Sequence, residues 1–290
     1  MPAASPAAAL PQPLLEILTS LRCPSCHGAL RAGSDQLGCS GCATTWPVRD
    51  EIAHLAVGGA AETWKCDAAA QSSEAYQRRY RMVEQAEDYN EAYRRERFKR
   101  WSTRRELQLL RRLVGSQGRS ATLLDVPCGG GRLSAELEPF TDRLIEADIA
   151  EGQLIYGRRR RTPQRPTVWM TASAFHLPLG DQAIDGTICC RLSHHLPTAD
   201  ERGRLVEELL RVSRRFVVLT FFDHHSLKNA IRRARRPLNG KPPKMTMTRG
   251  QVAALARAHG ARLAECPPLS RLASGHRYAL LVKPEAPRGA

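Results

Sequence analysis

The chain has 290 residues, of which 42% are hydrophobic, and its formal net charge is +15. This length exceeds one typical domain, and the apolar fraction is enough for a full α/β core with a small second unit. No stretch approaches eighteen uninterrupted apolar residues, which excludes a membrane-spanning helix from the expected elements.

The positive charge indicates an anionic partner. RNA, an acidic membrane surface and an acidic small substrate all meet this requirement. Charge alone does not choose among them, so the choice depends on the motifs.

The first thirteen residues and the cysteines bear on the compartment. Residues 1–13, MPAASPAAALPQP, lack the positive start and apolar run of a secretory signal, so we expect a disordered leader on a soluble, cytoplasmic protein. The nine cysteines are an odd number, and four of them occur in Cys-x-x-Cys pairs. This usage favours metal ligation and free thiols over a disulfide framework.

The first expected domain covers residues 14–57 and contains two cysteine pairs. Cys23 and Cys26 form one pair, Cys39 and Cys42 form the other, and twelve residues separate the pairs. Two such tight turns can place four thiolates around a tetrahedral structural zinc ion. Metal binding would contribute most of the folding free energy of so small a unit. The alternative is an unmetallated or redox-active thiol cluster.

Residues 58–120 are expected to form a basic helical linker or lid, with a long helix over 72–114. Arginines alternate with tyrosines, Phe98 and Trp101 in this region. One interpretation is a solvated helix face whose aromatic side chains pack inward, and the other is a lid or an anion-binding surface.

From residue 121 to residue 290, apolar strands alternate with helices, which predicts a doubly wound parallel sheet. Strands are expected at 122–126, 143–149, 167–171, 184–192, 216–222, 262–265 and 278–282. Helices are expected at 132–137, 152–160, 200–212 and 249–259. The last strand suits insertion at the edge of the sheet. Residues 223–247 form a basic insert in this domain.

A glycine-rich turn follows the first of these strands in the sequence LLDVPCGGGRL. Gly129 and Gly131 allow the backbone to approach a ligand that a Cβ would exclude, and Asp125 ends the strand. A helix opening at Arg132 would add N–H groups suited to a carboxylate. Asp148 ends the second strand, at the spacing where a carboxylate accepts both hydroxyls of a ribose.

With these motifs, residues 121–283 resemble the class I S-adenosylmethionine-dependent methyltransferases. The motifs are LLDVPCGGGRL, EADIAEGQL, the run LPLGDQAID and the segment SHHL. A nicotinamide-binding Rossmann domain is disfavoured because LPLGDQAID and SHHL fit no such pattern. The resemblance implies an enzyme with a Rossmann-like, seven-stranded methyltransferase sheet and S-adenosylmethionine as its cofactor.

The resemblance also implies a set of cofactor-binding residues. They are Asp125, Pro127, Cys128, Gly129, Gly131, Asp148, Ile149, Ser173, Ala174 and Arg191. Two positions depart from the family pattern: Pro127 replaces the first glycine, and Ser173 replaces a common aspartate on the adenine side. Pro127 is compatible with a turn entry, so we expect cofactor binding to survive. The adenine contact of Ser173 would be weaker, or would use the backbone near Ala174.

The catalytic candidates are His194 and His195, which lie where the family places groups near the transferred methyl group. Either could act as a base on the acceptor, and the alternative is a packing or capping histidine. Cys189 and Cys190 lack the neighbouring proline of the pyrimidine C5 methyltransferase motif, so they are interpreted as buried strand thiols.

The acceptor is expected to be small or lipid-linked and anionic. SHHL and LPLGDQAID are closer to the branch that methylates quinones, lipids and other small metabolites. The basic insert and residues 158–161 could form an anion-binding rim that contacts such an acceptor or an acidic membrane surface. The insert would equally suit RNA, so an rRNA or tRNA base methyltransferase is the alternative. The departures at Pro127 and Ser173 leave a non-catalytic, cofactor-binding scaffold as a third possibility.

The N-terminal unit resembles the small zinc-ribbon activator subunits that pair with methyltransferases. By position it is also similar to the zinc module of bacterial rRNA guanine-N1 methyltransferases. Basic and acidic residues are balanced over residues 14–57, whereas a ribbon that reads RNA should be positively charged. The balance favours a structural or docking role.

Overall fold

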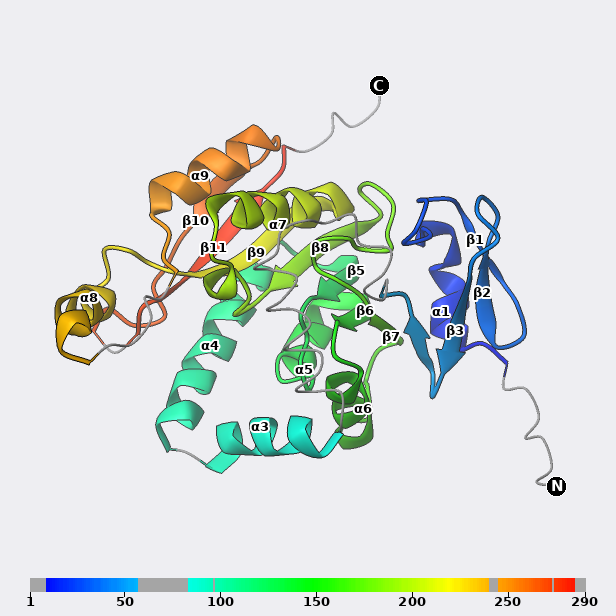
Figure 1. Cartoon of the computed structure of the whole chain (residues 1–290), viewed down its shortest axis with the longest axis horizontal. Helices are drawn as coiled ribbons and strands as arrows, with labels where there is room; N and C mark the ends of the chain where they lie inside the picture. Colours follow the sequence, from blue (N-terminus) through cyan, green and yellow to red (C-terminus); the bar gives the residue numbers. More distant parts are fainter. Residues whose placement is uncertain (1–8, 57–82, 96, 240–244, 273, 285–290) are drawn as a thin grey trace.

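A computed structural model describes residues 9–56, 83–95, 97–239, 245–272 and 274–284. The described residues form one α/β unit with a small N-terminal extension at its side (Figure 1). An eleven-stranded sheet runs through both parts in the order β1-β2-β3-β4-β7-β6-β5-β8-β9-β11-β10.

The N-terminal extension is an antiparallel meander preceded by a short helix. Its elements are α1 (Gln12–Glu16), the 3-10 turn η1 (Leu18–Ser20), β1 (Leu30–Ala32), β2 (Gln36–Cys39), β3 (Thr45–Arg49) and β4 (Ile52–His54). The last strand, β4, pairs in parallel with β7 through Ile52 and Trp169. The expected ribbon therefore continues the main sheet.

The ordered chain begins earlier than the leader expected at 1–13. Leu10 and Leu14 are buried in the main hydrophobic cluster, and α1 starts at Gln12. The expectation of disorder is therefore wrong for residues 10–13, because their apolar side chains have a core to cover. Residues 1–8 lie outside the described residues.

Two described helices lie between the extension and the main domain in the chain, and only the second of them is basic. They are α3 (Val83–Arg95) and α4 (Arg97–Gly115), and the predicted helical residues 72–82 lie outside the described residues. Trp101 is 41% exposed, so its expected inward packing is wrong. Glu106, Leu110 and Leu113 are buried on α4, which therefore covers the sheet with one face.

The main domain has the predicted Rossmann-like methyltransferase sheet. Its strands are β5 (Ser120–Asp125), β6 (Thr141–Asp148), β7 (Thr167–Thr171), β8 (Ile184–Cys189), β9 (Ser213–Phe222), β10 (Arg262–Glu265) and β11 (His276–Val282). β5 to β9 are mutually parallel, and β11 is inserted antiparallel between β9 and β10. The seven strands and the late edge insertion are thus confirmed.

Five α-helices and two 3-10 turns are described in this domain. They are α5 (Ser134–Leu137), α6 (Glu151–Arg160), α7 (Ala199–Val212), α8 (Leu227–Asn239) and α9 (Arg249–Ala258), with the 3-10 turns η2 (Glu138–Phe140) and η3 (Ser193–His195). Capping boxes start α7 and α9: Thr198 pairs with Glu201, and Thr248 pairs with Gln251. None of the helices in the described parts of the chain is long and apolar enough to cross a bilayer.

Two expectations need correction. The helix expected to open at Arg132 begins at Ser134 and lasts only four residues, so it offers no extended N-terminal anion site. The basic insert, expected without an element, contains the thirteen-residue helix α8.

Candidate functional site

The candidate site lies at the carboxyl ends of β5, β6, β7 and β8. β5 is flanked by β6 on one side and by β8 on the other, so the strand order reverses beside it. In open α/β sheets this is the place where ligands bind. The glycine loop follows β5 at this point, as the sequence predicts.

Asp148 at the end of β6 holds the glycine loop in place. Its Oδ2 accepts a hydrogen bond of 2.9 Å from the Gly129 N–H, and its Oδ1 accepts one of 2.9 Å from the Ala150 N–H. The Cys128 N–H also donates to the Ala147 carbonyl at 2.9 Å. Each carboxylate oxygen keeps a second lone pair, so Asp148 can still accept from a ligand.

The glycines of the loop are required by its backbone. Gly129 and Gly131 have φ angles of 55° and 71°, in the left-handed region that favours glycine. A Cβ on Gly130 would come within 2.6 Å of Asn90 Nδ2 on α3. The loop is therefore packed closely under α3.

Asp125 at the end of β5 is a buried carboxyl group without a hydrogen-bond partner among the described residues. Burial raises the pKa of Asp125 to about 8, and the neighbouring carboxylate of Asp148 raises it further while the Arg132 charge opposes this. A buried carboxyl group without a hydrogen-bond partner beside a glycine loop could form its hydrogen bonds with a bound ligand.

The raised pKa of Asp125 predicts a specific pH dependence. The folded state retains a proton that the unfolded chain releases above about pH 4, so the unfolding free energy should fall as the pH rises from about 4 to 8. Asp125→Asn should remove this fall and be more stable than the parent at pH 8 by at least about 1 kcal/mol. Urea unfolding at pH 4 and pH 8 measures the difference.

Asp185 provides the matched control of opposite sign. It is also buried, but hydrogen bonds from Arg214 and from the Thr122 and Ala121 N–H groups outweigh burial and lower its pKa. Asp185→Asn should therefore lose stability above about pH 4. Equal pH profiles for the parent and Asp125→Asn would show that Asp125 does not titrate as described.

A second buried carboxylate, Glu106, enters the site region from α4. It is 0% exposed and pairs with the guanidinium groups of Arg132 and Arg191, with the Arg191 Nη2 at 2.9 Å. The Tyr278 hydroxyl donates a hydrogen bond to the same carboxylate. Burial works against ionisation, but the two guanidinium charges prevail and hold the pKa of Glu106 at about 2.

This network changes the interpretation of Arg191. The sequence placed it among the cofactor-binding residues, whereas the structure places its side chain on Glu106. Its φ of 65° is unusual for a non-glycine residue, and its N–H donates to Thr220 Oγ1 at 2.6 Å. Glu106, Arg132 and Tyr278 were missed, because no sequence spacing connects α4 with β11.

The loop after β7 carries Ser173 and Ala174, which the sequence predicts on the adenine side of the cofactor, and it is called the adenine-side loop for that prediction. Ser173 Oγ accepts a hydrogen bond of 3.3 Å from the Phe175 N–H, and the His176 N–H donates to the Ser173 carbonyl at 3.0 Å. Ser173 thus closes its own turn, as serine often does. Ala174 lies next to it and is 8% exposed.

The histidine candidates gather beyond β8 and β9. The ring centroids of His194 and Phe222 are 4.4 Å apart, and those of His194 and His195 are 4.3 Å apart. His276 of β11 lies 5.5 Å from His194, and burial lowers the pKa of His276 to about 4. The sequence did not indicate His276, which is neutral at physiological pH and adds an aromatic wall to this end of the site.

The expected rim of residues 158–161 is not a set of free cations. Arg158 pairs with Glu51, Arg160 pairs with Glu87 and Glu91, and Arg161 pairs with Glu138 and Glu146. These arginines join α6 to its neighbours. Three of the four arginines are therefore engaged with carboxylates of neighbouring elements, whereas Arg159 is exposed and remains a candidate for the rim.

The comparisons with known proteins agree with this geometry. Residues 124–221 match the model of the methyltransferase domain family. The magnesium protoporphyrin IX methyltransferase of Synechocystis PCC 6803, solved with bound SAH, superposes with a TM-score of 0.56 and 16% identity over 65% of this chain and 88% of that one. That likeness shows a shared fold.

Residues 124–221 thus match a methyltransferase domain.

Two curated proteins are related to parts of the chain. Malonyl-[acyl-carrier protein] O-methyltransferase of Yersinia pestis is 27% identical over 37% of this chain and 38% of its own length. Demethylmenaquinone methyltransferase of Clavibacter sepedonicus is 33% identical over 31% of this chain and 36% of its own length. The chain thus spans less than two fifths of the length of either relative.

The four N-terminal cysteines come together beside the methyltransferase domain. The Sγ atoms of Cys23, Cys26, Cys39 and Cys42 all lie within 4.8 Å of one another. The Cys23–Cys42 and Cys26–Cys39 separations are 3.7 and 3.4 Å, near the edge of about 3.8 Å of a tetrahedron with metal–sulfur bonds of about 2.3 Å.

Two glycines and one amide shape the cysteine cluster. A Cβ on Gly28 would lie 3.2 Å from two of the sulfurs, and one on Gly41 would lie 3.3 Å from Cys26 Sγ. The Gly41 N–H donates to Cys39 Sγ at 3.2 Å, as amides do to metal-bound thiolates. The residues therefore fit a tetrahedral metal ion.

The cysteine-bearing extension contacts the adenine-side loop of the methyltransferase domain. His176 Nε2 lies 2.6 Å from the Pro24 carbonyl, and the rings of His27 and His176 meet edge to face at 4.7 Å. The Arg22 N–H donates to the Pro178 carbonyl at 3.0 Å. One end of the loop after β7 is thus held by the residues around Cys23 and Cys26.

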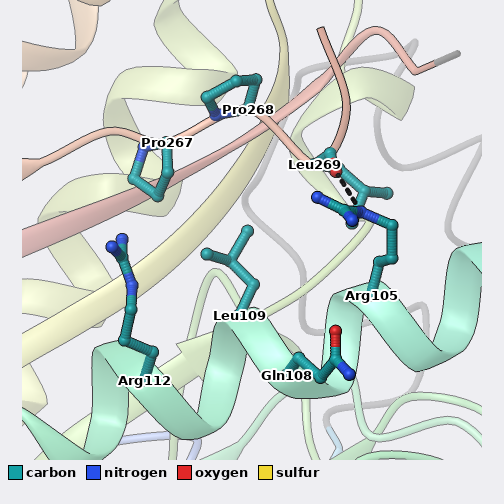
Figure 2. A pocket seen from close by; sticks show the side chains of 7 residues that line it. All are labelled: Arg105, Gln108, Leu109, Arg112, Pro267, Pro268 and Leu269. Carbon is teal, nitrogen blue, oxygen red and sulfur yellow. Dashed lines mark hydrogen bonds between the residues drawn. The ribbon is translucent and has the colours of Figure 1, made fainter.

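Two further features lie outside the candidate chemistry. Cys189 and Cys190 are buried, and burial raises the pKa of both thiols, which agrees with their interpretation as structural residues. A hollow of about 320 Å³ lies between α4 and the segment before β11. Figure 2 shows the side chains that line it, among them Arg105, whose Nε donates a hydrogen bond of 3.2 Å to the Leu269 carbonyl. The predicted site residues do not line it.

Proposed function

We propose that the chain is a methyltransferase that transfers a methyl group from S-adenosylmethionine to a small or lipid-linked, anionic acceptor. The observation that carries the proposal is the pairing of Asp148 with the glycine loop, beside the orphaned carboxyl group of Asp125. Together they form a cradle with unmet hydrogen-bonding capacity at the switch point of the sheet.

Each proposed cofactor contact follows from this cradle. Asp148 would accept the ribose hydroxyls through its remaining lone pairs, next to Ile149. Gly129 and Gly131 would admit the amino-acid end of the cofactor, with Pro127 and Cys128 shaping the turn. Because Ser173 is already engaged with Phe175, the adenine would contact the backbone near Ala174 instead.

The chemistry requires positioning more than acid–base work. When bound, S-adenosylmethionine supplies a methyl group on a sulfonium, and the sulfur departs neutral. The protein's contribution is to align the acceptor and exclude water. His194, with His195 beside it, is proposed to take a proton from an acceptor hydroxyl or amine, with Phe222 and His276 walling off solvent.

The acceptor class rests on two considerations. The partly matching relatives are named for a malonyl-thioester carrier and for demethylmenaquinone, which are a carboxylate-bearing and a lipid-soluble acceptor. Beyond β9 the chain presents the arginine-rich helix α8, which suits an anionic acceptor or its surroundings.

The extension is proposed to be a zinc ribbon with a docking role. Four thiolates at tetrahedral spacing are the ligand set of structural zinc, and no position would remain open for chemistry at the metal. The contacts with His176 and Pro178 support a role in holding the adenine-side loop. This role parallels the activator subunits that the segment resembles.

Asp148→Asn tests the cofactor proposal. The asparagine side chain has one acceptor oxygen, so it can accept from the Gly129 N–H or the Ala150 N–H but not from both through separate oxygens, and it offers one acceptor fewer to the ribose. Affinity for S-adenosylmethionine should therefore fall about tenfold to a hundredfold. Calorimetry on the purified full chain measures it. Asp142→Asn, at the other end of β6, changes an exposed carboxylate paired with Arg119 and should bind like the parent. Unchanged affinity in Asp148→Asn would contradict the assignment.

The acceptor class is tested with labelled cofactor. The protein is incubated with S-adenosylmethionine carrying a labelled methyl group and with separate lipid, small-molecule and RNA fractions. Label in the lipid or small-molecule fraction supports the proposal. Label confined to RNA would favour the base methyltransferase, and cofactor binding without transfer to any fraction would favour the scaffold.

A further inference from the structure

Helix α8 carries an apolar stripe that faces solvent. Leu227 is 50% exposed and Ile231 is 42% exposed. Ala230 and Ala234 are exposed as well, and the spacing of the four residues places them on one side of the helix. A helix of a globular protein normally packs such a stripe against the protein core. This stripe is exposed instead, so it can contact an apolar partner outside the protein.

The rest of α8 is cationic. The helix contains Lys228, Arg232, Arg233, Arg235 and Arg236 and has no acidic residue. Arg233 and Arg235 are exposed on either side of the apolar stripe. A short, strongly basic helix with a narrow apolar face is the sequence and structural signature of a segment that lies in the plane of an anionic bilayer.

We propose that α8 docks the protein on the surface of an anionic lipid bilayer. Leu227 and Ile231 enter the acyl region, while Arg233 and Arg235 remain among the phosphates. Leu272, which is 73% exposed, is a further apolar contact in the segment before β11. That segment is tied to α8 because Asn229 Nδ2 on the helix donates to the Gly275 carbonyl at 3.4 Å.

The docking helix begins at the acceptor end of the site. The guanidinium carbon of Arg232 lies 5.4 Å from the centroid of the Phe222 ring, whose own centroid is 4.4 Å from that of His194. Figure 1 places α8 at one end of the molecule and the ribbon at the other. A bilayer under α8 would present lipid-dissolved or lipid-linked molecules to this end. Delivery of the acceptor in this way rests on the proposed function, whereas docking itself does not.

The apolar stripe decides between a bilayer and RNA. Phosphate backbones are bound by cationic and polar groups, with aromatic rings for base stacking. Exposed leucine and isoleucine at helical spacing add nothing to such binding, but they account for insertion between lipid headgroups.

Vesicle sedimentation with the full chain, without cofactor or acceptor, tests docking. The parent should bind vesicles of phosphatidylglycerol mixed equally with phosphatidylcholine, bind pure phosphatidylcholine weakly, and detach as salt is raised. Leu227→Gln combined with Ile231→Gln keeps a helix-forming side chain and should weaken binding by about a hundredfold. Arg233→Gln combined with Arg235→Gln should weaken binding to the anionic vesicles by about thirtyfold.

Leu15→Gln is the matched control, because Leu15 is a 37% exposed leucine on α1. It should bind vesicles like the parent. Failure of the parent to bind anionic vesicles, equal weakening in Leu15→Gln, or salt-sensitive binding to RNA in place of vesicles would overturn the proposal. Calorimetry with S-adenosylmethionine on the same proteins separates the two ideas: a parent chain that binds the cofactor but not the anionic vesicles would count against docking alone.

Discussion

Glu106→Gln is expected to lower the free energy of unfolding by about 3–5 kcal/mol, because it leaves two partly buried guanidinium groups without their counter-charge. Glu106 is 0% exposed, whereas the side chains of Arg132 and Arg191 are 21% and 23% exposed. The glutamine keeps the volume and can still accept from Tyr278, so the loss measures charge and not packing. Chemical denaturation at neutral pH gives the difference directly.

The pKa of Glu106 adds a second readout for this prediction. The pKa is about 2 in the folded protein and near 4.5 in the unfolded chain, so the stabilisation is present above about pH 4.5 and is lost as the pH falls through 2. The parent and Glu106→Gln should therefore converge in acid. Glu136→Gln, which removes the partner of the 58% exposed Arg111, should cost no more than about 1 kcal/mol. If the two variants lost similar unfolding free energy, the ion pairs of Glu106 would be no stronger than a surface ion pair.

The sequence predicts those helices and strands whose own residues show a hydrophobic pattern or a capping motif. β7 and β10 have the expected bounds, and α7 starts one residue before the expected position because Thr198 caps it. β4 was not predictable: three residues are too short for a pattern, and its partner β7 lies more than a hundred residues further along the chain. The ribbon's continuity with the sheet follows from that long-range pairing.

α8 was missed for a different reason. Its run of arginines, the proline near its end and the absence of acids indicate a polar loop, yet Leu227 and Ile231 are spaced as on one helix face. The apolar stripe that would have revealed the helix is also the one that does not join the core. Helices are usually predicted from an apolar face that packs on the core, and the described residues of α8 form no such buried face.

Some residues of the candidate site could likewise be predicted from the sequence, and others could not. The carboxylates of Asp125 and Asp148 could be found because each ends a strand and a contiguous motif marks the first. The Glu106 network joins α4, the loop after β8 and β11, and its members have no common spacing. Ion pairing across such distances in the chain becomes visible only once the strands are placed.

Zinc removal is expected to unfold the ribbon and to weaken cofactor binding with it. Structural zinc contributes on the order of 10 kcal/mol to small domains, and the four cysteines are the metal-ligand cluster found among the described residues. Without it, the Pro24 carbonyl would leave His176 and the Arg22 N–H would leave Pro178. Because these contacts hold the adenine-side loop, affinity for S-adenosylmethionine should fall about tenfold.

Cys39→Ser and chelation of the parent test this coupling in parallel. Metal analysis should find about one zinc per parent chain and none in the Cys39→Ser variant. Limited proteolysis should cut the ribbon both in this variant and in the chelated parent. Cys266→Ser, a buried thiol before β11, should keep its zinc and its affinity. Restoring zinc to the chelated parent should restore binding measured by calorimetry. If chelation removes zinc and exposes the ribbon while affinity stays unchanged, the ribbon does not position the adenine-side loop, and Ser173 and Ala174 hold their conformation through the Phe175 turn alone.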